Sequence, residues 1–168
     1  MAVFETTMDA LMHLKKHDKA LGAVIERLGP LSVPLQTDLF TSLVEAIVSQ
    51  QISGKAAQTV CTRLHQRLGT IEPKTVCDAA DEFLQAAGMS FRKVTYIKRA
   101  AQAVLDGSVR LEHLESMDDQ AVIAELTKLP GIGVWTAEMT LLFTLGRPDV
   151  LSWNDFGIRK GIMLLYRH

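Results

Sequence analysis

Two glycines, a tryptophan and an aspartate lie close together in the stretch 129–155, the part of the chain best suited to chemistry. Gly131 and Gly133 flank Ile132 between two stretches with helical spacing, which predicts a tight turn with Ile132 packed beneath it. Backbone amides at such a turn, and at the start of the helix that follows, can bind a phosphate. Asp155 could stabilise a developing positive charge or activate water. Taken alone, the glycines favour an ordinary helix connection and Asp155 favours a helix N-cap.

Helices are expected to position these residues. Apolar residues at helical spacing predict helices over 19–28, 39–48, 54–68, one or two within 73–87, then 91–105, one through Val122, Ile123 and Leu126 that leads to the turn, 134–145 and one after 154. The expected N-caps are Asp18, Ser53 and Ser90, a capping box of Ser116 with Asp119, and Asn154 or Ser152 for the last helix. Residues 31–36 are expected to form a connector. Because alternating segments long enough for a strand are lacking, the predicted fold class is all-α.

The bulk composition restricts the class of protein. The chain has 168 residues, of which 48% are hydrophobic and 22% charged, as expected for one globular domain. A formal net charge of −1 argues against a protein that coats nucleic acid by charge alone, so any DNA contact must be local. Cys61 and Cys77 are too few for an all-cysteine metal site. Lacking a signal peptide or membrane-spanning pattern, the chain is expected to be cytoplasmic.

Three blocks of sequence together resemble the helix-hairpin-helix (HhH-GPD) superfamily of base-excision DNA glycosylases, in particular the 3-methyladenine DNA glycosylase II branch. They are residues 46–53 with Ala56 and Ala57, Gly88 followed by Lys93 and Tyr96, and residues 129–155. Asp155 follows Trp135 by 20 positions (155 − 135), the spacing of the alkylation-repair branch. The resemblance implies a two-lobed helical bundle with the hairpin between the lobes, and hydrolytic removal of an alkylated purine from duplex DNA. Because Trp135 stands where bifunctional members have a lysine nucleophile, it also implies a monofunctional enzyme.

The resemblance assigns roles to individual residues. Asp155 would be catalytic. Gly131, Gly133 and Thr136 would contact a phosphate, with a monovalent cation at the carbonyls of Leu129 and Gly131. Trp135 would wall the pocket for the flipped base, where its ring suits a cationic methylated base. The weaker wall candidates are Trp153, Tyr96 and Phe40. Gln50 and Gln51 would lie at the minor groove, where Gln51 or Ile52 fills the gap left by the flipped nucleotide. Further phosphate contacts are expected from Lys55, Arg92, Lys93 and Arg159.

Other readings of the sequence remain open. The hairpin could belong to a DNA-structure-binding module without turnover, to a glycosylase for another damaged base, or to a helical interaction protein. No cofactor is expected, and the protein is expected to be a monomer associated with a bacterial-type nucleoid. The apolar segment 161–166 near the end predicts a missing helical partner, so residues 1–168 are interpreted as one glycosylase domain that lacks a C-terminal segment.

Overall fold

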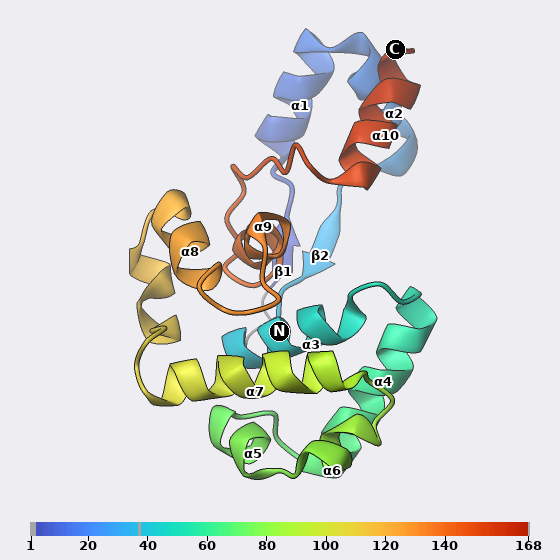
Figure 1. The fold of residues 1–168 in the computed structure, drawn as a ribbon. Coiled ribbons are helices and arrows are strands. Elements are labelled where there is room, and N and C mark those ends of the chain that lie inside the picture. Colours follow the sequence, from blue (N-terminus) through green and yellow to red (C-terminus); the bar gives the residue numbers. More distant parts are fainter. Residues whose placement is uncertain (1–2, 37, 168) are drawn as a thin grey trace.

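The computed structural model describes residues 3–36 and 38–167, which form an almost entirely helical chain (Figure 1). In chain order the elements are β1 (Val3–Glu5), α1 (Met8–His17), α2 (Lys19–Leu28), β2 (Ser32–Pro34), α3 (Leu39–Ser49), α4 (Gly54–Leu68), α5 (Pro73–Asp78), α6 (Asp81–Gln85), α7 (Phe91–Leu105), the 3-10 helix η1 (Leu111–Ser116), α8 (Asp119–Leu126), α9 (Val134–Phe143) and α10 (Phe156–Tyr166). The expectation of an all-α fold is confirmed.

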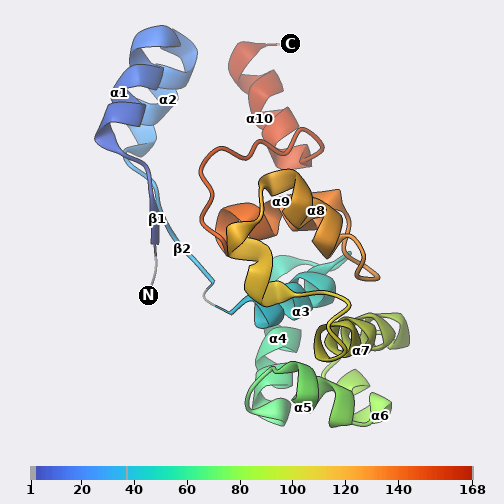
Figure 2. The ribbon, with the colours of Figure 1, turned by 90° about the vertical axis from the view of Figure 1, so that its left-hand side faces the viewer.

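The helices form two groups with the hairpin between them. In the larger group α7 packs against α5, α6 and α3, while α3 also packs against α4 and α9. The smaller group consists of α1, α2 and α10, which lie at one end of the molecule in both ribbon views (Figures 1 and 2). The α8–α9 hairpin lies between the two groups (Figure 2). This arrangement confirms the predicted two-lobed bundle.

The core belongs to the larger group and the hairpin. Leu43, Ile47 and Ile97 on α3 and α7 are fully buried, as are Leu126 and Leu141 on the hairpin helices. In α10, by contrast, no described residue is buried. The hairpin is therefore fixed to a rigid body through α3, while α10 joins the fold by a small contact with α2.

Side-chain caps explain where most helices begin. Asp18, Ser53 and Ser90 accept hydrogen bonds from the third residue beyond them, as predicted. The predicted Ser116–Asp119 box is wrong, because Ser116 ends the 3-10 helix η1 and the Asp118 side chain accepts from Ala121 N instead. The Asp118 carboxylate lies next to the first turn of α8 and occupies the N-cap position that was predicted for the Ser116 hydroxyl, two residues earlier.

Besides the 3-10 helix η1, the elements β1, α1 and β2 were not expected from the sequence. Helix α1 begins after Thr7, whose hydroxyl caps Ala10 N, and β1 pairs with β2 in an antiparallel ladder that aligns Phe4 with Val33. Each strand has three residues, and residues 31–36, expected as a connector, contribute β2. Alternation over three residues is too short to be distinguished from a connector.

Candidate active site

The glycine turn of the hairpin joins α8 to α9, and its two glycines differ in role. Gly131 has φ +87°, and a Cβ there would lie 2.5 Å from Cδ2 of Tyr96, so both backbone and packing require glycine. Gly133 has φ −97°, which any residue adopts, and a Cβ there would meet no atom within 4 Å. The backbone conformation therefore requires glycine at position 131 but not at position 133. Ile132 is buried beneath the turn, as predicted.

The first turn of α9 presents free backbone amides. The N-cap of α9 is Gly133, and no side chain caps this helix. The first amide that bonds within the helix is that of Ala137, which donates to Gly133 O at a distance of 3.0 Å. The amides of residues 134–136 are consequently without an intrahelical acceptor. Because the positive end of the helix dipole coincides with these amides and with the open space at Gly133, an anion could approach the backbone closely.

Asp155 is held by two donors, one on each carboxylate oxygen. Oδ1 accepts the amide of Ile158 at 2.8 Å, which makes Asp155 the N-cap of α10, and Oδ2 accepts Nε1–H of Trp135 at 2.7 Å. The amide of Ile158 and then the Trp135 indole hold the pKa of Asp155 below the usual aspartate range. The expectation that Asn154 or Ser152 caps α10 is wrong, because the carboxylate occupies that position. One side chain can therefore be the N-cap of α10 through Oδ1 and a residue of the candidate site through Oδ2.

A second contact ties the Asp155 loop to α9. Ser152 is fully buried and its hydroxyl donates to the carboxylate of Glu138, which lies one helical turn beyond Trp135 on α9. The amide of Asp155 in turn donates to Ser152 O at 3.1 Å. On the other side, a Cβ at Gly157 would lie 3.0 Å from Asp155 Oδ1. The carboxylate is thus held by hydrogen bonds from α9 and α10, and the lack of a side chain at Gly157 leaves the space that Oδ1 occupies.

A cavity of about 380 Å³ lies beside Trp135, between the end of α3 and the start of α9. Its lining consists of Ala46, Ser49, Gln50, Gln51, Trp135, Thr136 and Met139. The volume falls in the range of small-ligand sites, and the lining is mostly apolar with a few polar groups. Trp135 forms part of the wall and its Nε1 donates to Asp155, so the carboxylate is joined to the cavity wall by one hydrogen bond.

Residues 44–168 match the family described as HhH-GPD superfamily base excision DNA repair protein. The chain belongs to this superfamily. It is 34% identical over 132 residues to DNA-3-methyladenine glycosylase 1 of Schizosaccharomyces pombe, a match covering 76% of this chain and 58% of that protein. The chain thus spans somewhat more than half of that relative.

Two solved structures share the fold of this HhH-GPD protein. The crystal structure of a DNA-3-methyladenine glycosidase from Bacillus halodurans has a TM-score of 0.84 at 37% identity, with 99% of this chain and 77% of that chain covered. The Schizosaccharomyces pombe 3-methyladenine DNA glycosylase in complex with abasic DNA also has a TM-score of 0.84, at 31% identity, with 95% and 81% covered. Both likenesses cover the hairpin together with the two groups of helices.

The aromatic residues expected at the pocket separate into different places in this HhH-GPD protein. Trp135 lines the cavity and is 47% exposed, whereas Trp153 is 66% exposed on the loop before Asp155. Phe40 is buried in the core, and Tyr96 packs against Gly131 beneath the hairpin. Neither of these two lines the cavity. Thr136 is buried and lines a hollow together with residues of α3.

The polar residues expected at DNA also differ in position. Gln51 and Ile52 are exposed at the tip of the loop between α3 and α4, while the Gln50 amide donates to Gly131 O at 2.6 Å. Lys93 directs its ammonium to backbone carbonyls of α3 and is not free to contact a phosphate. The exposed cations among these candidates are Lys55, Arg92 and Arg159.

The carbonyls expected at a monovalent cation each accept one hydrogen bond. Leu129 O accepts the amide of Ile132 at 3.1 Å, and Gly131 O accepts the Gln50 side chain. Binding of a monovalent cation at these carbonyls stays a prediction. Over residues 3–36 and 38–167, no cluster of three or more His, Cys, Asp or Glu side chains suits a metal ion, and no helix is long and apolar enough to span a membrane.

Sequence reasoning missed several residues of the site. Met139 follows Trp135 by four positions, and Ala46 precedes Gln50 by four, so helical spacing from the named residues would have placed both on the cavity wall. The Glu138–Ser152 contact joins residues in different elements and has no such signal.

Proposed function

We propose that this chain is a monofunctional DNA glycosylase that flips an alkylated purine, of the 3-methyladenine type, out of duplex DNA and hydrolyses its N-glycosidic bond. The observation that carries the proposal is the hydrogen bond that joins Asp155 to Trp135, a residue of the cavity wall. The relatives named as 3-methyladenine glycosylases support the substrate class. The amides at the start of α9 would hold a phosphate near the lesion.

The chemistry follows from the charge of the substrate. A methylated purine is already cationic, so it leaves without a general acid and its departure places positive charge on the sugar. The exposed face of Trp135 attracts a cationic base, and the nearby carboxylate of Asp155 stabilises the positive sugar until water attacks. Trp135 cannot form a Schiff base, since indole nitrogen is not nucleophilic, so strand cleavage through a lysine at this position is not expected.

The geometry favours electrostatic stabilisation over proton abstraction as the role of Asp155. Its two oxygens accept hydrogen bonds from Ile158 and Trp135, which keep its pKa low and its charge present at neutral pH. A carboxylate with a low pKa is a weak base. We therefore assign Asp155 chiefly to stabilising the positive charge on the sugar.

The test is an Asp155→Asn variant. Asparagine keeps an N-cap oxygen for α10, so the fold should persist, but it removes the negative charge. Single-turnover release of 3-methyladenine from a duplex should fall about a hundredfold or more. Binding to a duplex with an abasic analogue should change little. Asp149→Asn, the same change at an exposed position of the same loop, is the matched control and should release base at the wild-type rate.

Two outcomes would count against the proposal. Undiminished release by Asp155→Asn would remove Asp155 from the chemistry. A wild-type chain that binds abasic duplex but releases no base would instead indicate a DNA-structure-binding module. Duplexes that each carry a different single lesion, assayed in parallel, would show whether another damaged base is preferred.

A further inference from the structure

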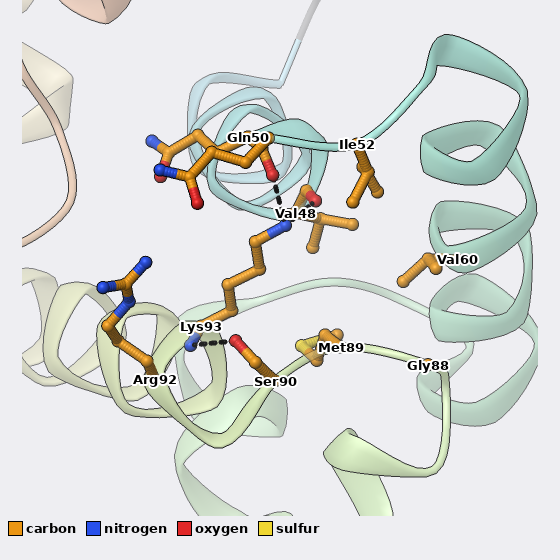
Figure 3. Close-up of a pocket in the computed structure, with 10 residues that line it drawn as sticks. Val48, Gln50, Ile52, Val60, Gly88, Met89, Ser90, Arg92 and Lys93 are labelled. Carbon is orange, nitrogen blue, oxygen red and sulfur yellow. Dashed lines mark hydrogen bonds between the residues drawn. The ribbon is translucent and has the colours of Figure 1, made fainter.

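The loop between α3 and α4 separates two cavities. Gln50 and Gln51 line the cavity beside Trp135 and also a second one of about 210 Å³ on the other side of the loop. The second cavity is lined as well by Arg92 and Lys93 at the start of α7 (Figure 3). Gln51 lies at the exposed tip with φ 60°, a left-handed conformation that non-glycine residues seldom adopt. Such a conformation persists only where neighbouring contacts impose it.

Lys93 supplies contacts that hold this loop. Its Nζ donates to Val48 O at 2.6 Å and to Gln50 O at 2.7 Å (Figure 3). These carbonyls belong to the end of α3, where helix carbonyls lack intrahelical partners and where the helix dipole attracts a cation. Burial, and next the charge of Arg92, lower the pKa of Lys93, which agrees with an ammonium directed into the protein.

The contacts continue from the loop to the hairpin. The Gln50 side chain donates to Gly131 O at 2.6 Å, so a single residue receives the Lys93 ammonium on its backbone and binds the glycine turn with its amide. Tyr96, one helical turn beyond Lys93 on α7, packs against Gly131. Helix α7 therefore contacts both the loop tip and the phosphate-binding turn.

We propose that Lys93 is a positioning residue: by capping the end of α3 it fixes the Gln51 loop, which enters the DNA, relative to the α8–α9 hairpin, which holds the backbone. The inference rests on the proposed function. It also gives a role to the Gly88–Lys93–Tyr96 block, which the catalytic chemistry does not use. Lys93 contacts neither Asp155 nor Trp135 among the described hydrogen bonds, so its effect should fall on base flipping and not on bond cleavage.

The experiment compares one lesion in two settings. Lys93→Met keeps a similar side-chain length but loses the ammonium. Single-turnover release of the alkylated purine should fall about tenfold or more when the lesion is paired in a duplex, because the loop no longer stabilises the flipped state. When the same lesion sits in an unpaired bulge, where unstacking is already complete, release should fall less than about threefold. Equal losses on both substrates, or no loss on the paired one, would overturn the inference.

Three further variants separate positioning from stability. Lys93→Arg retains a charged donor and should recover most of the paired-lesion rate. The matched control is Lys98→Met, at a residue that lies on α7 like Lys93 and forms a partly buried ion pair with Asp81 of α6 (2.6 Å). This variant loses the ion pair but leaves the loop intact, so it should lower stability and leave the release rates on both substrates unchanged. A paired-lesion defect in Lys98→Met would contradict the inference. If Lys93→Met does not fold, Lys93→Gln, which keeps a shorter neutral donor, tests the same contacts and should show the same selective loss to a smaller extent.

A readout without excision keeps the two proposals apart. In a duplex with 2-aminopurine next to an abasic analogue, wild-type protein should raise the fluorescence as the loop enters, and Lys93→Met should bind with a smaller rise. A wild-type chain that raises the fluorescence but excises no base would contradict the proposed function. The positioning role of Lys93 would then still be decided by the fluorescence rise in wild type compared with that in Lys93→Met. Equal fluorescence changes in wild type and Lys93→Met would contradict the positioning role alone.

Discussion

At the scale of single residues, Asp155 combines two tasks that usually compete. One oxygen caps α10 through Ile158 and the other accepts the Trp135 indole. Both donors favour the ionised carboxylate, so the same contacts that begin the helix also maintain the charge that the proposed chemistry requires. In addition to the stacking role proposed for its ring, Trp135 orients the carboxylate and lowers its pKa through the indole N–H.

The Trp135→Phe variant tests whether the indole N–H lowers the pKa of Asp155. The ring area is partly kept, but the donor to Oδ2 is lost, so the pKa of Asp155 should rise from its lowered position toward that of an ordinary aspartate, about 3.9. A pH titration of the Asp155 side-chain carboxyl carbon by NMR measures the shift. An unchanged or lower pKa in Trp135→Phe would show that the Ile158 amide alone sets the charge.

At the scale of elements, the hairpin depends on its two glycines for different reasons. Gly131 permits the positive φ and the contact with Tyr96, whereas Gly133 leaves open space in front of the free amides of α9. The sequence could show that both positions are glycine. It could not distinguish a glycine required by the fold from one that clears an approach for a ligand.

Alanine at each position should separate the two roles. Gly131→Ala should lose about 2 kcal/mol or more of unfolding free energy, from backbone strain and the overlap with Tyr96. Gly133→Ala should unfold like the wild type but bind abasic duplex more weakly, because its methyl group projects toward the phosphate. Chemical denaturation and a DNA titration at fixed salt measure the pair. Wild-type DNA affinity in Gly133→Ala would remove the turn from the interface.

Sequence reasoning was most successful where a signal is local. The helices of the larger group and three of the predicted caps are confirmed, since spacing and N-cap chemistry act within a few residues. Contacts between distant segments were not accessible. Lys93, expected at a phosphate, instead caps α3 across 45 positions of sequence, and Phe40, considered for the pocket, is core. Charge and aromaticity identify what a side chain can bind, but only the packed fold decides what it meets.

At the scale of the whole molecule, the long segment between α9 and α10 is fastened at several points. Arg147 donates to Met117 O at 2.6 Å and to the Asp119 carboxylate at 2.5 Å, which joins this segment to η1 and α8. Ser42 on α3 bonds Thr144 at 2.8 Å. The loop that carries Asp155 is thus positioned by the larger helical group as well as by α10, and the carboxylate belongs to a scaffold that spans most of the chain.

Gly157 links the stability of this scaffold to the geometry of its carboxylate. Its backbone is ordinary helix, so Gly157→Ala should favour α10 by about 0.5–1 kcal/mol through a smaller loss of backbone freedom. The added Cβ would, however, lie 3.0 Å from Asp155 Oδ1 and press the carboxylate out of place. Because the displaced Oδ1 is also the N-cap acceptor of Ile158, a weaker cap offsets this gain, so we expect thermal stability close to that of the wild type together with slower base release. Faster release in Gly157→Ala, or a clear loss of stability, would contradict this account.

The glycine at position 157 therefore marks a trade-off between robustness and activity. Helix propensity alone would favour alanine there, since the substitution suits the backbone. A stabilisation programme guided by helix propensity would choose this site and, under the proposed function, would slow base release. One missing methyl group leaves the Asp155 carboxylate its position next to Trp135, at the expense of a lower helix propensity at the start of α10.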